Sequence, residues 1–190
     1  MMKLTKTIRS RLIHGTLMCA MATTALAGGT AHAATQGTLG ATSTGTVAIS
    51  ASVPNRARIS GLNDVSFLTQ DPNTGASSAQ NVCLWSNTAT KGYTITASGS
   101  GATSAFTLAN GTLTVPYSVQ WSASSGATTG TGLTAATASA GLVSTATQQT
   151  CATGVTSSAS LIVNIGTSDL GSMQAQTTYT GTLTLLVTPA

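Results

Sequence analysis

The chain has 190 residues, of which only 5% are charged, with seven basic residues, three acidic residues and two histidines. Four of the basic residues and both histidines fall within the first 33 positions, so residues 34–190 carry a net charge of about zero. The basic overall pI is therefore no argument for nucleic-acid binding. Residues 34–190 also contain neither His nor Glu, which excludes a Ser–His arrangement and leaves few groups for acid–base chemistry. We expect no enzyme, no cofactor, no metal site and no nucleic-acid partner.

The first 33 residues have the pattern of a secretory signal peptide. Four basic residues, Lys3, Lys6, Arg9 and Arg11, precede a mostly apolar stretch from Leu12 to Leu26, and Ala31-His32-Ala33 is a suitable cleavage site. We therefore predict a cleaved leader at 1–33, an N-terminal extension at 34–54 and a single domain at 55–190. Cleavage there implies export across the inner membrane.

In the extension, residues 46–53 alternate strictly between polar and apolar side chains. The apolar set is Val47, Ile49, Ala51 and Val53. A period of two predicts a β-strand with one buried face. Such a strand is either the first strand of its own domain or a strand that completes another molecule, and periodicity alone favours the first.

Further short strands are predicted, in chain order, at 58–62, 65–68, 82–85, 93–97, 105–108, 112–121, 161–165 and 179–187. Asn110-Gly111 is a favoured pair for a tight hairpin turn, and Pro116 indicates an edge or a bulge. No segment has helical periodicity. Many short strands separated by turn signals predict an all-β fold, specifically a β-sandwich. The immunoglobulin signature itself is absent, because Gln149 stands where a tyrosine is expected, two residues before Cys151.

Cys83 and Cys151 are the only cysteines after the leader. In an exported chain a single pair has one possible internal connectivity, so we predict a Cys83–Cys151 disulfide. Two independent buried thiols are the alternative.

Three other features each have a structural and a functional interpretation. Trp85 and Trp121 are core aromatics or sugar-binding faces, and the apolar patterns around them favour the core. Arg56 and Arg58 project from one face, as a solvated edge or a subunit contact. The stretch 71–75 is an Asx turn rather than a calcium loop, because the further acidic ligands are missing.

The chain resembles fimbrial subunits (pilins) of the chaperone–usher pathway, nearest to the class 5 or alternate pilins, with kinship to archaic and spore-coat-U-like pilins. Four stretches carry the resemblance: Thr46-Val47-Ala48-Ile49-Ser50-Ala51-Ser52-Val53-Pro54 with the following 59–62; Val115-Pro116-Tyr117-Ser118-Val119-Gln120-Trp121; 161–165; and Thr178-Tyr179-Thr180-Gly181-Thr182-Leu183-Thr184-Leu185-Leu186-Val187. The cysteine pair and the long lead-in at 34–45 depart from some members of the class.

The resemblance implies an immunoglobulin-like sandwich that lacks its last strand and is completed by a donor strand from another subunit. The implied donor residues are Val47, Ile49, Ala51 and Val53, and the residues implied to border the groove are Tyr179, Leu183, Leu185 and Val187. The implied partners are identical or related pilins, a periplasmic chaperone and an outer-membrane usher. The implied location is the periplasm and then a surface fimbrium that supports adhesion or biofilm formation. A secreted or tip-located carbohydrate-binding sandwich, with host or surface glycans as partners, is the alternative function.

Overall fold

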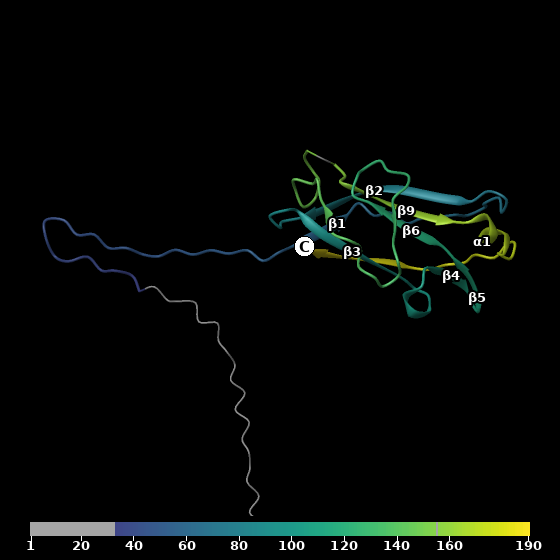
Figure 1. Ribbon diagram of the computed structural model, residues 1–190, viewed down its shortest axis with the longest axis horizontal. Coiled ribbons are helices and arrows are strands. Elements are labelled where there is room, and N and C mark those ends of the chain that lie inside the picture. The colour runs from purple at the N-terminus through teal and green to yellow at the C-terminus, as the bar shows by residue number, and fades with distance from the viewer. Residues whose placement is uncertain (1–32, 155) are drawn as a thin grey trace, which may run out of the picture. The chain divides into compact units, whose positions relative to one another are not determined.

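The computed structural model describes residues 33–154 and 156–190, so most of the predicted signal peptide lies outside the described residues. The fold is all-β with antiparallel pairing throughout, as predicted (Figure 1). The elements are β1 (Ala57–Ser60), β2 (Ala76–Ser86), β3 (Gly92–Gly99), the 3-10 turn η1 (Ala102–Ser104), β4 (Thr107–Asn110), β5 (Leu113–Pro116), β6 (Ser118–Ser122), β7 (Thr131–Gly132), β8 (Leu142–Val143), β9 (Ala159–Ile165), α1 (Thr167–Gly171) and β10 (Leu183–Pro189).

The chain divides into two units, Met1–Ser52 and Val53–Ala190. In the described part of the first unit, Thr35 and Thr46 form an antiparallel bridge through two main-chain hydrogen bonds of 2.9 Å. Residues 47–52, which follow this bridge, are in no strand. All the named strands belong to the second unit, which we call the domain.

The domain contains a five-stranded sheet in the order β1-β2-β9-β6-β7, a three-stranded sheet in the order β10-β3-β8, and the β4–β5 hairpin. The hairpin forms where the sequence predicts it, but Asn110 pairs with Leu113, so the two-residue turn is Gly111-Thr112. Gly111 has φ +57°, and glycine at the first turn position is typical of a type II′ hairpin.

The principal core joins the two larger sheets. In β3, the side chains of Tyr93, Ile95 and Ala97 are fully buried and alternate with half-exposed Thr and Ser, as the period of two predicts. They share a cluster with Val82 and Leu84 of β2 and with apolar residues of β6 and β9. Burial of one face from each sheet therefore holds the domain together.

Three predicted strands differ from the structure. The strand expected at 112–121 is divided, since β5 pairs with β4 whereas β6 pairs with β7 and β9. Residues 65–68 form no strand, although Val65 and Phe67 are half-buried and pack against the core. The closing strand begins at Leu183 rather than at Tyr179, because Thr180 instead forms an isolated bridge with Ala109 of β4. The five-residue helix α1 is a single turn whose one buried side chain is Leu170, too short for a periodicity to reveal it.

The predicted disulfide is present. Cys83 of β2 is bonded to Cys151, and both half-cystines are buried with Ala146 and flanked by Trp85. The bond ties the long loop after β8 to the five-stranded sheet.

Replacing both cysteines by alanine is expected to lower the free energy of unfolding by about 4 kcal/mol, because a cross-link spanning 68 residues restricts the unfolded chain. Urea unfolding of the double variant measures the loss. Reduction of the unmodified domain should give a similar value. A loss below about 1 kcal/mol would contradict the prediction.

Candidate functional site

A large apolar groove, with a volume of about 1290 Å³, runs along one side of the domain. Leu161, Val163 and Ile165 of β9 line its floor, and these side chains belong to the two main apolar clusters. Small-molecule pockets usually measure about 300–1,000 Å³. The size and the apolar floor therefore favour a length of polypeptide over a small ligand.

One wall of the groove is the segment 62–70, which follows β1. It is joined to β2 by the side chain of Gln80, whose Oε1 accepts a hydrogen bond from the Asn63 main-chain N–H at 2.7 Å, while its Nε2 donates to the Asn63 carbonyl at 3.1 Å. The two side-chain hydrogen bonds of Gln80 stand where a paired strand would form a ladder of main-chain hydrogen bonds. The segment therefore lies beside the sheet as a wall without extending it.

The opposite wall includes residues 173–183 and Leu185, and it leads into β10. Among the described residues, β10 pairs with one strand only, β3. Leu183, Leu185 and Val187 are half-buried against the principal core, whereas the alternate residues Thr184 and Leu186 are exposed. The free edge of β10 offers main-chain N–H and C=O groups to an added strand.

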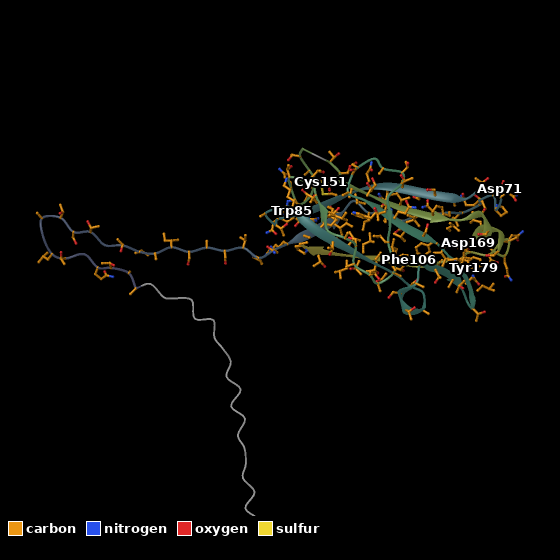
Figure 2. The ribbon with its side chains drawn as sticks, viewed as in Figure 1. Asp71, Trp85, Phe106, Cys151, Asp169 and Tyr179 are labelled. Atoms are coloured by element: carbon orange, nitrogen blue, oxygen red, sulfur yellow. A yellow bond between two sulfur atoms is a disulfide. The ribbon has the colours of Figure 1, made fainter. Side chains whose placement is uncertain are left out.

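Helix α1 and Tyr179 lie at one end of the groove. Leu170 and Tyr179 line this end and share a buried cluster with Ile165, and the Tyr179 hydroxyl accepts a hydrogen bond from the Gln174 N–H at 3.2 Å. Figure 2 labels Tyr179 near Asp169, at the α1 end of the domain. Asp64 is the one charged residue in the described part of the lining, whose other polar side chains are uncharged.

Three of the four residues expected to border the groove line it: Tyr179, Leu183 and Leu185. Val187 packs against the same core beyond the groove. Sequence reasoning missed the wall at 62–70 and the end formed by Leu170 and Met173. The spacing of Val65 and Phe67 indicated one buried face, but nothing in that spacing showed that no strand would pair beside it.

The extension residues are exposed, and residues 47–52 are in no strand. Val47, Ile49 and Val53 are 74%, 92% and 82% exposed, and Ala51 is exposed as well. Isolated apolar side chains on a surface are ordinary, but an alternating row of them in an unpaired segment is the pattern of a strand without its sheet.

The tryptophans offer little to a sugar ring. Trp121 is 2% exposed, and its Nε1–H donates to the Tyr93 hydroxyl at 3.1 Å, so both polar tips are used in the core. Trp85 is half-buried beside the disulfide.

Within residues 33–154 and 156–190 no cluster of three or more potential metal-ligating side chains occurs. No helix of the same described part is long and apolar enough to cross a membrane.

No protein-family model matches this chain, and no curated protein matches it.

Burial raises the pKa of the Tyr93 hydroxyl, an effect that the Trp121 hydrogen bond partly offsets, and burial also raises the pKa of Tyr117. In the unfolded chain Tyr93 and Tyr117 ionise near pH 10, which is at lower pH than in the folded chain. The two neutral tyrosines therefore make their full contribution to the free energy of unfolding below about pH 10. This contribution is lost as the pH rises through their folded-state pKa values.

We expect the free energy of unfolding to fall above about pH 10, and the slope to be shallower in a Tyr93→Phe/Tyr117→Phe variant. Urea unfolding at several pH values between 8 and 11 measures both slopes. Because Tyr93→Phe also leaves the Trp121 N–H without its acceptor at every pH, the slopes and not the absolute stabilities are compared. Identical slopes would contradict the assignment.

Proposed function

We propose that this chain is a structural subunit of a cell-surface fimbrium, which polymerises when the extension of one copy completes the domain of the next. In this proposal the domain is an immunoglobulin-like β-sandwich without its last strand. The leader at 1–33 exports the chain, a periplasmic chaperone occupies the groove first, and an outer-membrane usher directs the exchange. The fimbrium supports adhesion or biofilm formation.

The observation that carries the proposal is the combination of an apolar groove beside a free strand edge with an exposed, alternating apolar segment in the same chain. Each needs what the other has. The groove needs a strand with apolar side chains on one face, and residues 47–53 need a sheet edge and a core.

The energetics suit a durable contact. Burial of Val47, Ile49 and Val53 contributes about 1.5–3 kcal/mol for each side chain, and the main chain gains hydrogen bonds along β10 by β-augmentation. Part of this gain offsets the entropy of ordering the extension. Head-to-tail donation is a heterologous contact that does not close on itself, so its product is a fibre.

The sugar-binding alternative has weaker support. It would use the tryptophan faces, but Trp121 is buried and Trp85 is half-buried beside the disulfide.

Deleting residues 34–53 is expected to give folded domains that do not polymerise, because the donated side chains are gone while the groove remains. Deleting only 34–45 is the matched control, since it removes the lead-in and keeps Val47 to Val53, and it should polymerise. Refolding by dilution from guanidinium, followed by light scattering and electron microscopy, measures both. Fibres from the longer deletion would refute the donor assignment.

Ile49→Asp is expected to slow polymer growth at least tenfold, because a carboxylate would then be buried against the apolar floor. Ser50→Asp adds the same charge to the other face of the extension and should grow nearly as the unmodified protein does. A synthetic peptide of residues 46–54 should bind the 34–53 deletion, and its Ile49→Asp form should not. Equal growth of the two variants would place a different segment in the groove.

A further inference from the structure

Five of the six charged side chains of the domain lie at its two ends, and the sixth, Asp64, lies in the groove wall at 62–70. Asp71 and Asp169 lie at the end where β2 begins and β9 ends, since Ala76 pairs with Ile165. Figure 2 labels these two aspartates at one end of the domain and Trp85 and Cys151 at the other. We call the Asp71 and Asp169 end the acidic end.

Three cations lie at the opposite end. Arg58 pairs with Trp85, and Lys91 ends the turn between β2 and β3. The Arg56 main-chain N–H donates to the Asn87 side chain in the same turn, and both arginines and Lys91 are exposed. A chain that ends at Ala190 adds one carboxylate here, beside Gly92, so the cations remain in excess. This is the basic end.

The extension joins the domain at the basic end. Asn87 holds residues 54–56, which link the extension to β1, through three hydrogen bonds. Its Nδ2 donates to the Pro54 carbonyl at 2.9 Å and its Oδ1 accepts from the Arg56 N–H at 2.6 Å. Its own main-chain N–H donates to the Arg56 carbonyl at 3.0 Å. Arg56 follows Val53 by three residues, a span of about 10 Å in extended chain. Any groove that accepts Val53 therefore has Arg56 close to its mouth.

The groove reaches the acidic end. Pro72, which follows Asp71, and Leu170 and Gly171, which follow Asp169, all line it. Asp71 and Asp169 are therefore next in sequence to residues that line the groove at this end, although neither is itself a lining residue. The end at which the extension leaves one copy and the end that the groove of the next copy reaches carry opposite charge.

We propose that the basic end of one copy docks against the acidic end of a second copy, with Arg56 and Arg58 facing Asp71 and Asp169. This charge pairing orients the incoming subunit so that its extension enters the groove at the acidic end. The inference rests on the proposed function, because it assigns the end-to-end surface of the same polymer. Exposed ion pairs add little affinity, but opposite fields on two approaching surfaces raise association rates by about 10–10³ at low salt.

The test compares polymer growth of purified chains that carry changes at either end or at both. Asp71→Asn/Asp169→Lys weakens and reverses the acidic end, and asparagine can still accept the Asn73 N–H that forms the Asx turn at Asp71. Arg56→Glu/Arg58→Glu reverses the basic end, where Lys91 then stands beside two carboxylates. The fourfold variant combines the changes, so that a net positive end again faces a net negative end.

At about 10 mM salt each single-end variant is expected to grow about tenfold more slowly, whereas the fourfold variant grows clearly faster than either of them. The differences should disappear at about 0.5 M salt, where charges are screened over a few ångströms. Thr128→Lys/Thr131→Lys, which adds two charges at exposed positions in and before β7, should leave growth nearly unchanged.

Single-end variants that grow at the unmodified rate in low salt would overturn the inference, and so would a fourfold variant that stays slow. Far-ultraviolet circular dichroism and the urea midpoint of each variant separate misfolding from slow docking. Neither growth result bears on the proposed function, which fails when the 34–53 deletion forms fibres or when Ile49→Asp grows as fast as Ser50→Asp.

Discussion

The unpaired edge of β10 beside an uncovered part of the core is the constraint on which this structure depends. Sheets normally protect an edge strand with charge, proline or a covering element. The apolar faces that form a core are normally covered along their whole length. Here the edge strand has Leu183 and Leu185 on the side of an apolar groove, and the opposite wall at 62–70 is held by the side chain of Gln80. A domain with such an edge has a hydrogen-bonding and an apolar requirement at one place, and a single added strand meets both.

The same requirement accounts for the composition. A surface with three acidic and three basic residues after position 33 has little charge repulsion against self-association. In most soluble domains that would be a liability, because neutral strands with free edges aggregate without order. In an assembling subunit it is an advantage, since packed neighbours cover surface that would otherwise need charged residues. Five of the six charged side chains after position 33 lie at the two ends of the domain, where they would favour one orientation of neighbours in a filament of the proposed kind.

Much of the fold could be predicted from the sequence, because a strand buried on one face repeats every two residues. Tyr93, Ile95 and Ala97 were identified as a buried face in this way, and the disulfide followed from an even cysteine count in a chain expected to be exported. Periodicity reports burial, however, and not pairing. Val65 and Phe67 have the pattern of a strand and lie unpaired, while Tyr179 belongs to a separate cluster that ends before β10 begins. The groove could not be derived from the residues alone, since it is made by segments about 100 residues apart.

The three hydrogen bonds of Asn87 have a mechanical consequence. In a filament of the proposed kind, tension along the fibre would enter each domain through Pro54 to Arg56, where Asn87 ties the link to the end of β2. β2 is the longest strand, pairs with both β1 and β9, and carries Cys83 near that end. Tension applied there would act at the same time on the main-chain hydrogen bonds of β2 with its two neighbours and on the Cys83–Cys151 disulfide. Such a joint would pass strain from subunit to subunit without peeling the sheet apart.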